Sequence, residues 1–525
     1  MRTAILLLLL LAVAAIPGSL VPQRGADPNG VVQYFDNHPD LAPFLDSLQA
    51  FDVYTSAWFS SIYLLLFLSL IGCVIPRSAH HLKALRTPPP KTPARLDRLS
   101  GYTTVHEPEA DSSRASGQVT AVTAIERAST LLRRSGYRVR RFDGLSKSGA
   151  PELSVSAERG YLRETGNLVF HTALIGVLIS IGIGGSFAYS GQKVVVEGQP
   201  FVNVLNDYSS FKPGRFFTDT ALPPYRLVLE KFSVEYERDN FDAYGFASGF
   251  AADVTVHIPG EKSYQEQIRV NHPLNILGAD TFLLGNGYAP HITVTDGEGN
   301  VAFTDAVPFL PQDANMTSLG VIKVPDALPE QLGMIGFFYP TADELATGAL
   351  TSSFPDLRDP VLTLNVYTGD LGVDDGVPRS VYTLATDEMT QVAGALSEVK
   401  AIQLRPGEAA ELPGGLGTVT FDDMAQQVAT GEDDAARDFS DSVPRFASFD
   451  MNHDPSKVWV LGFAILVIAG LLTGLFIPRR RIWVKAMDED GGIRIEYAGL
   501  ARGDDPALEA AVADIARRHA AALKD

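Results

Sequence analysis

Four long apolar runs stand out from an otherwise mixed pattern of polar and apolar residues. They cover residues 5–20, 57–75, 168–189 and 458–477. A helix of about 20 apolar residues crosses the hydrocarbon core of a bilayer. The pattern therefore predicts four transmembrane helices, at residues 1–21, 56–76, 165–190 and 456–478. The first run also fits a signal peptide, because it follows Arg2 and offers Val13 and Ala15 as a cleavage pattern.

The longest stretch between these runs, residues 191–455, has the pattern of β structure. Short β-branched or aromatic segments recur in it and are separated by Gly, Pro, Asn and Asp, for example at 193–196, 227–236, 253–258 and 362–367. Many short strands with such turns are typical of antiparallel sandwiches or barrel-like folds. The acidic block Gly431-Glu-Asp-Asp434 is expected to be a solvated loop rather than a metal site.

The loop at 77–164 and the tail at 479–525 show similar small patterns. The loop predicts a helix at 119–135 and strands at 137–142 and 153–157. The tail predicts a hairpin of 482–487 and 493–497, then a helix that begins after Asp504-Asp505-Pro506. Its apolar face would comprise Leu508, Val512, Ile515 and Leu523. Neither part is large enough to bury a core alone, so we expect them to pack together as one α+β module.

Charge predicts the orientation of these parts. Residues 77–163 contain 16 Lys and Arg against 8 Asp and Glu, whereas residues 191–455 contain 15 against 39. The tail opens with three arginines at 479–481. Since basic loops stay on the cytoplasmic side, residues 77–164 and 479–525 are predicted inside, and 22–55 and 191–455 outside. The fold class is thus a polytopic α-helical membrane protein with an extracytoplasmic β-rich domain and a small cytoplasmic module.

Composition excludes several classes of function. The chain has a net charge of −19, so it has no global footprint for nucleic acid. Its one cysteine, Cys73, excludes an intrachain disulfide, a Cys-x-x-Cys redox or zinc motif and a haem-attachment motif. Phosphate-loop, zinc-protease and nucleophile-elbow motifs are also missing from the sequence. Gly182-Ile-Gly-Gly185 indicates helix packing. The sequence offers no catalytic constellation, which predicts that the protein is not an enzyme.

Two of the ten histidines are candidate ligands. His171 lies inside the third apolar run, where an ionisable group is costly and is often functional. It either forms a structural hydrogen bond with a hydroxyl or carbonyl group of a neighbouring helix or binds haem iron, for which neutral imidazole is a common axial ligand. His453 precedes the fourth run and is either a site residue or part of a turn capped by Asp454. His80 and His81 are expected to be solvated at the membrane edge.

Several motifs together resemble the ResB family (also called CcsB) of System II cytochrome c biogenesis, of an actinobacterial type. The motifs are Leu70-Ile-Gly-Cys-Val-Ile-Pro-Arg77, Arg163-Glu-Thr-Gly-Asn-Leu-Val-Phe-His171, Gly191-Gln-Lys-Val-Val-Val-Glu-Gly198, Asn271-His-Pro-Leu274 with Gly285-Asn-Gly-Tyr-Ala-Pro290, and His453-Asp-Pro455 with Arg479-Arg-Arg-Ile-Trp483. The resemblance runs over nearly the whole chain, and the combination is specific although each motif alone is weak.

This resemblance implies a function. ResB-type proteins work with a ResC/CcsA-type membrane protein that has a tryptophan-rich WWD domain, and together they carry haem b outward and attach it to apocytochrome c. Other proteins of the pathway reduce the apocytochrome thiols. The resemblance makes His171 the main candidate for a haem ligand in transit, and His453 a weaker one. The alternative is a scaffold or apocytochrome-binding factor that never touches haem.

Overall fold

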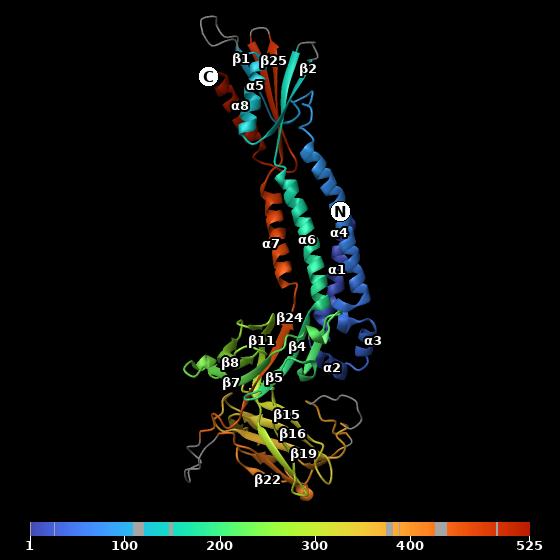
Figure 1. The fold of residues 1–525 in the computed structure, drawn as a ribbon, viewed down its shortest axis with the longest axis vertical. Helices are drawn as coiled ribbons and strands as arrows, with labels where there is room; N and C mark the ends of the chain where they lie inside the picture. Colours follow the sequence, from blue (N-terminus) through green and yellow to red (C-terminus); the bar gives the residue numbers. More distant parts are fainter. Residues whose placement is uncertain are drawn as a thin grey trace. The chain divides into compact units, whose positions relative to one another are not determined.

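A computed structural model describes residues 2–25, 27–108, 120–145, 151–373, 382–387, 389–425, 438–489 and 492–524. The chain divides into two units (Figure 1). One unit combines Met1–Ile183 with Ser456–Asp525, and the other is Gly184–Pro455. The acidic block at 431–434 lies outside the described residues.

Apolar helices form the centre of the first unit. Among the described residues, three helices are long and apolar enough to cross a membrane: α4 (Ala57–Arg86), α6 (Leu162–Phe187) and α7 (Lys457–Phe476). The helix α1 (Arg2–Leu20) packs against α4, but its apolar part, Ile5–Leu20, is shorter. Three of the four predicted segments thus meet the criteria of length and hydropathy. Short helices follow α1, namely α2 (Pro28–Asn37), α3 (Ala42–Ser47) and η1 (Ala50–Thr55).

Two helix boundaries differ from the sequence prediction. The helix α4 continues for ten residues beyond its predicted end at 76, because Pro76 removes one backbone donor without ending the helix. The helix α6 starts at Leu162 and ends at Phe187, and Tyr189 already belongs to the strand β4. These shifts matter because they add polar turns to both helices where α4 and α6 meet the rest of the unit.

The remainder of the first unit is one α+β module, as predicted. Its five strands lie in the order β1-β26-β25-β3-β2, and every pairing between them is antiparallel. The strands are β1 (Ser100–Pro108), β2 (Arg138–Leu145), β3 (Pro151–Arg159), β25 (Arg480–Glu489) and β26 (Gly492–Ala501). The helices α5 (Ala121–Arg134) and α8 (Leu508–Lys524) cover one face of the sheet and share its apolar core. The expectation that loop and tail pack together is confirmed.

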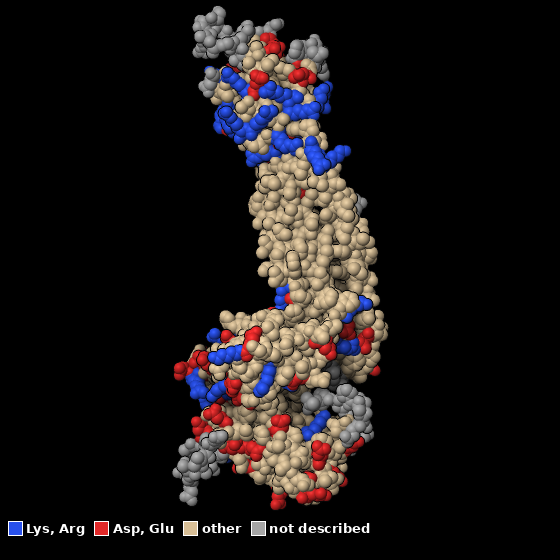
Figure 2. Space-filling view, viewed as in Figure 1, with Lys and Arg blue, Asp and Glu red and all other residues tan. Residues whose placement is uncertain are grey.

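The amphipathic patterns of the two module helices explain this core. Ile125 and Leu132 of α5 and Val512 and Ile515 of α8 are buried against the sheet. Trp483 points to the opposite face, where it packs with Leu96 of the linker after α4. On the face seen in Figure 2, Lys and Arg side chains gather over the module, whereas the surface of the apolar helices is almost free of charge.

The second unit is β-rich and contains two large apolar cores. One core lies between a five-stranded and a four-stranded sheet, in the orders β10-β11-β24-β4-β6 and β5-β7-β8-β9. Their strands are β4 (Tyr189–Val196), β5 (Pro200–Val202), β6 (Ser210–Pro213), β7 (Arg226–Tyr236), β8 (Ala247–His257), β9 (Tyr264–Arg269), β10 (Leu274–Ile276), β11 (Ala279–Tyr288) and β24 (Arg445–His453).

The other core lies between the sheets β13-β12-β23-β22 and β14-β15-β16-β19-β20, with β21 also paired to β19. Their strands are β12 (His291–Asp296), β13 (Val301–Ala306), β14 (Leu310–Pro311), β15 (Ser318–Val324), β16 (Leu332–Tyr339), β19 (Val361–Thr368), β20 (Thr390–Ala393), β21 (Ile402–Leu404), β22 (Ala409–Glu411) and β23 (Gly417–Phe421). A separate hairpin pairs β17 (Ala342–Glu344) with β18 (Leu350–Ser352). The predicted β-rich region is present, but it contains two sandwich-like pairs of sheets, each with its own core, rather than one.

Candidate functional site

His171 lies in the third turn of α6, and its environment fixes its tautomer. The ring nitrogen Nδ1 is 2.7 Å from the backbone oxygen of Asn167. A carbonyl oxygen can only accept, so Nδ1 carries the hydrogen and Nε2 keeps a lone pair. No described residue forms a hydrogen bond to Nε2. The hydrogen bond of His171 thus lies within α6 and not between helices. Its Nε2, the nitrogen that could bind a metal, has no hydrogen-bond partner among the described residues.

His453 lies in the second unit, at the end of β24. Its Nδ1 donates to the backbone oxygen of Gly278 at 2.7 Å, and its ring stacks on Tyr189 with centroids 5.8 Å apart. The alternative with Asp454 as helix cap is wrong, because the N-cap of α7 is Ser456, which makes no side-chain cap hydrogen bond. Nε2 of His453 therefore also keeps its lone pair.

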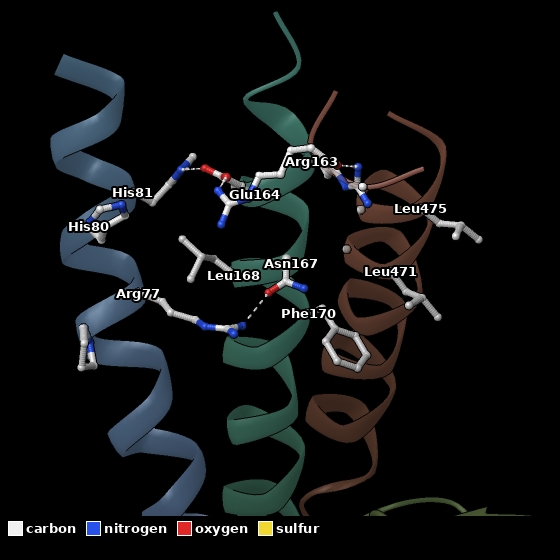
Figure 3. Close-up of a pocket in the computed structure, with 15 residues that line it drawn as sticks. Arg77, His80, His81, Arg163, Glu164, Asn167, Leu168, Phe170, Leu471 and Leu475 are labelled. Carbon is white, nitrogen blue, oxygen red and sulfur yellow. Dashed lines mark hydrogen bonds and ion pairs between the residues drawn. The ribbon is translucent and has the colours of Figure 1, made fainter. Parts of the chain in front are cut away.

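A pocket of the first unit lies where α4, α6 and α7 meet the loop between β26 and α8. Its volume is about 830 Å³, which is within the usual range of small-molecule sites. Apolar side chains line much of it and polar ones converge on it (Figure 3). The residues that line it include Arg77, His80, His81, Arg163, Glu164, Asn167, Leu168, Phe170, Gly470, Leu471, Gly474, Leu475 and Arg502. Neither His171 nor His453 lines this pocket.

Two glycines set the distance between α6 and α7 beside the pocket. A Cβ atom at Gly166 would lie 2.8 Å from the backbone oxygen of Gly470, and one at Gly470 would lie 2.6 Å from the backbone nitrogen of Phe170. Small residues let helix backbones approach in this way. The helix packing expected at Gly182 and Gly185 is not found within the described chain, because a Cβ atom at either would meet nothing within 4 Å.

One face of α4 contributes three polar residues to the pocket. Arg77, His80 and His81 are spaced by three and four residues, so they share a face of the extended helix. The expectation that His81 is solvated is wrong: it is buried, its Nδ1 lies 3.3 Å from the Glu164 carboxylate, and its Nε2 lies 3.0 Å from the Thr165 hydroxyl. His80 is exposed, as expected.

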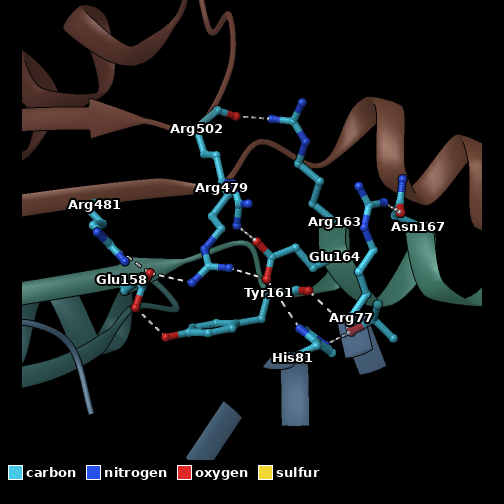
Figure 4. A network of polar contacts seen from close by, with 11 residues as sticks. Arg77, His81, Glu158, Tyr161, Arg163, Glu164, Asn167, Arg479, Arg481 and Arg502 are labelled. Atoms are coloured by element: carbon cyan, nitrogen blue, oxygen red, sulfur yellow. Dashed lines mark hydrogen bonds and ion pairs between the residues drawn. The ribbon is translucent and has the colours of Figure 1, made fainter. Parts of the chain in front are cut away.

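A network of charged residues joins the module to the start of α6 (Figure 4). Arg479 lies 2.7 Å from Glu158 and also pairs with Glu164, which in turn pairs with Arg502. Arg481 is a second partner of Glu158, at 3.0 Å. Glu158 and Arg479 are almost fully buried, with 3% and 8% of their side chains exposed. Their pairing compensates a desolvation cost of several kcal/mol per ion.

The same network shifts two pKa values in the module. Burial alone would raise the pKa of Glu158, but hydrogen bonds from Tyr161, Arg479 and Arg481 hold it below its ordinary value. Burial and the adjacent Glu158 carboxylate raise the pKa of Tyr161 to about 12. Glu158 therefore stays ionised and Tyr161 stays protonated near neutral pH, which keeps the junction between sheet and helix intact.

The pocket combines positive charge with apolar walls. Of the residues that the structure describes, three arginines (Arg77, Arg163 and Arg502) and one carboxylate (Glu164) line it. Leu168, Phe170, Leu471 and Leu475 supply apolar surface. Such a site suits a ligand with a flat apolar body and anionic groups at one edge.

Local sequence patterns do not reveal this pocket. Arg77 and Arg163 belong to motifs of the family resemblance, no motif contains Arg502, and the sequence predicts a solvated His80. The one available signal was the spacing of Arg77, His80 and His81, which becomes informative once α4 is known to extend to Arg86. The contributions of Gly470 and Arg502 depend on contacts across more than 300 residues, which no local pattern contains.

The sequence of the chain is similar to that of a known protein family and of several named proteins. The model of the ResB-like family matches residues 1–513. The cytochrome c biogenesis protein CcsB of Prochlorococcus marinus (strain NATL1A) is 26% identical over 287 residues, covering 53% of this chain and 57% of that protein. CcsB of Synechococcus sp. (strain CC9311) is 28% identical over 290 residues, covering 54% and 57%.

CcsB of Gloeobacter violaceus (strain ATCC 29082 / PCC 7421) is 27% identical over 286 residues, covering 52% of each chain. The chain thus matches a little over half the length of these curated relatives. The family model, in contrast, extends from the first apolar helix through the β-rich unit to the last helix of the module. By this match over nearly its whole length, the chain belongs to the ResB-like family.

Proposed function

We propose that this protein is a membrane subunit of cytochrome c biogenesis that handles haem. With a ResC/CcsA-type WWD-domain partner it moves haem b to the outer face and supports haem attachment to apocytochrome c. It is a non-catalytic subunit of the plasma membrane, and other proteins keep the apocytochrome thiols reduced. The family membership and the names of the relatives support the pathway.

The observation that carries the haem-handling role is the tautomer of His171. An Nδ1 hydrogen bond to a backbone carbonyl is the usual way in which a protein orients a metal-binding imidazole, and it leaves Nε2 to the metal. His171 is four residues beyond Asn167, so it lies on the pocket side of α6, about 6 Å further along the helix. The haem iron would bind there in transit, with the second axial ligand from another helix of the complex.

The proposed orientation places the basic module in the cytoplasm and the acidic β-rich unit outside. The excess of Lys and Arg in residues 77–163 and the arginines at 479–481 support it. Topology reporters fused after Thr87 and after Gly198 are expected to give opposite signals. Equal signals from the two fusions would contradict this arrangement.

The test of the haem role is a spectrum of the complex purified with its WWD partner. His171→Ala and His171→Gly are expected to remove the Soret band of retained haem and to stop cytochrome c maturation. Added imidazole should restore part of the band in His171→Gly, because it refills the position of the ligand. A His171→Ala complex with its full haem absorbance would eliminate the assignment and favour the alternative, a scaffold for apocytochrome c without haem contact.

His453→Ala is the matched control in this experiment. Its Nδ1 also donates to a backbone carbonyl, but in the proposed topology His453 belongs to the outer surface and His171 to the cytoplasmic half of α6, with most of a hydrocarbon core of about 30 Å between the two levels. On this proposal one haem does not bind both imidazoles of a single chain. His453→Ala is therefore expected to keep the haem that depends on His171, whatever its effect on maturation.

A further inference from the structure

We propose that the arginine-lined pocket is a capture site for haem, in which His80 binds the iron before His171 does. The inference rests on the proposed haem-handling function and adds a second, shallower site to it. His80 is the one exposed imidazole among the described residues that line the pocket. No described residue forms a hydrogen bond or an ion pair with its ring, so either ring nitrogen can bind a metal.

The charges of the pocket fit the propionate edge of haem. Glu164, the only carboxylate among the described residues that line the pocket, already pairs with Arg479 and Arg502 and contacts His81. The guanidinium of Arg163 donates to the backbone oxygen of Arg502, which is a neutral partner. Among the described residues Arg163 has no carboxylate within ion-pair distance, and its acidic neighbour Asp505 is already paired with Arg480. Its guanidinium can therefore bind a further carboxylate in bidentate geometry. An anionic edge bound here replaces a hydrogen bond to a carbonyl by an ion pair.

The apolar walls fit the porphyrin. Leu168 and Phe170 of α6 and Leu471 and Leu475 of α7 all line the pocket, and Figure 3 shows Leu168 on the side of α4 and Phe170 on the side of α7. The close approach of the two helices at Gly166 and Gly470 holds these side chains on one packed surface. A flat apolar ring gains burial against them, whereas a compact anion such as phosphate would leave them exposed to water.

The position of the pocket suits transfer to the deeper ligand. His81 beside His80 contacts Glu164, and His171 is seven residues further along α6. At 1.5 Å per residue the two levels are about 10 Å apart along the helix. A haem held by His80 and the arginines can therefore reach His171 by a short movement along the same face of α6.

The experiment uses the full-length His171→Ala chain in detergent, so that the deeper ligand is absent. Ferric haem and iron-free protoporphyrin are titrated into it, with and without His80→Ala or Arg163→Ala. We expect His80→Ala to weaken haem binding by about tenfold or more and to leave protoporphyrin binding unchanged. Arg163→Ala should weaken both ligands by about tenfold, since both have the same carboxylates. His106→Ala, at an exposed histidine of β1, is the control and should change neither.

The outcomes separate this inference from the proposed function. If His80→Ala leaves haem affinity unchanged in the His171→Ala chain, the capture site is wrong, and the role of His171 in the purified complex still stands. If anionic phospholipid displaces both ligands and only Arg163→Ala has an effect, the pocket binds lipid headgroups and the inference also fails. If the wild-type complex retains no haem at all, the proposed function fails first.

Discussion

Two turns of the same helix differ sharply in how they are held. In the first turn of α6, Glu164 contacts residues from three other segments: His81 of α4, Arg479 before β25 and Arg502 after β26. In the third turn, the hydrogen bond of His171 stays within its own helix. The fixed turn orients α6 on the module, and the open turn leaves an imidazole available to a ligand. A rigid support with an unsatisfied functional group is how proteins pre-organise binding sites.

Removing the tail should have the largest effect, because it disrupts the module that holds the first turn of α6. A chain that ends after Lys485 lacks residues 486–489 of β25 and all of β26 and α8, so the sheet loses a strand and part of its central one, and α5 loses much of its apolar cover. Residues 121–159 are then expected to become accessible to protease. Limited proteolysis of inverted vesicles measures this, with an intact-length chain carrying Asp514→Ala as the control. Unchanged protection would show that the loop folds without the tail.

The substitution Arg479→Ala should destabilise the fixed turn next. It leaves the buried carboxylate of Glu158 with one fewer cation and removes a partner of Glu164. Breaking a buried ion pair costs about 3–5 kcal/mol. Thermal unfolding of the purified chain should therefore shift to lower temperature. Arg517→Ala, in a pair whose arginine is 80% exposed, is the comparison and should cost less than about 1 kcal/mol. Equal shifts of the unfolding temperature in both variants would show that the buried ion pairs of Arg479 contribute no more to stability than the exposed pair of Arg517.

A smaller loss of stability is expected when the pH is lowered, because the buried His519 of the module resists protonation. His519 is buried; its Nε2 donates to the backbone oxygen of Ala124, and its Nδ1 accepts from the Tyr497 hydroxyl. Burial lowers the pKa of His519 below its ordinary value, and Arg127 acts in the same direction. The unfolded chain then binds the proton more tightly than the folded one.

The contribution of His519 to stability is therefore complete above its unfolded pKa of about 6.5 and falls as the pH decreases towards its folded pKa. The slope cannot exceed about 1.4 kcal/mol per pH unit for one proton. Denaturant unfolding between pH 7.5 and 5 measures it. His519→Gln should flatten this dependence, whereas His106→Gln, which changes an exposed histidine, should retain it. A slope that survives His519→Gln would assign it to other groups.

The smallest effect on stability is expected at the open turn. His171→Ala removes only the hydrogen bond to Asn167 within α6 and some contact with Phe170. Alanine is also the best helix former, so the change in unfolding free energy should stay within about 1 kcal/mol. Thermal unfolding of haem-free protein measures it. A large destabilisation would mean that His171 has a structural role, and the loss of haem in this variant would then need another explanation.

Much of the fold was predictable because its elements have strong local patterns. The helix α5 has Ile125 and Leu132 on one face, and α8 has Val512 and Ile515 at the same kind of spacing. The apolar runs give α4, α6 and α7 directly. The strand β1 escaped prediction because its sequence, Ser-Gly-Tyr-Thr-Thr-Val-His-Glu-Pro, has little apolar alternation; it is a strand because β26 supplies its partner.

Only part of the candidate site was predictable, because local patterns reveal single unusual residues but not contacts between distant segments. His171 is conspicuous because an ionisable side chain in an apolar run is costly and is usually functional. The burial of His81 is invisible locally, since it depends on Glu164 and Thr165, which are more than 80 residues away. Arg479 looked like a marker of orientation, and only the fold shows that it is an internal partner of Glu158 and Glu164.

The order of the strands has a consequence for biosynthesis. Ser100 of β1 pairs with Gly499 of β26, and β3 pairs with β25, so the sheet cannot be completed until the ribosome has made the residues of β26, up to Ala501. Until then the β2–β3 hairpin and β1 present unpaired edges, which are prone to aggregation. Closing the sheet joins segments that lie about 400 residues apart in the sequence. Only a chain that has been synthesised past β26 can therefore close it, and shorter nascent or truncated chains remain exposed to chaperones and proteases.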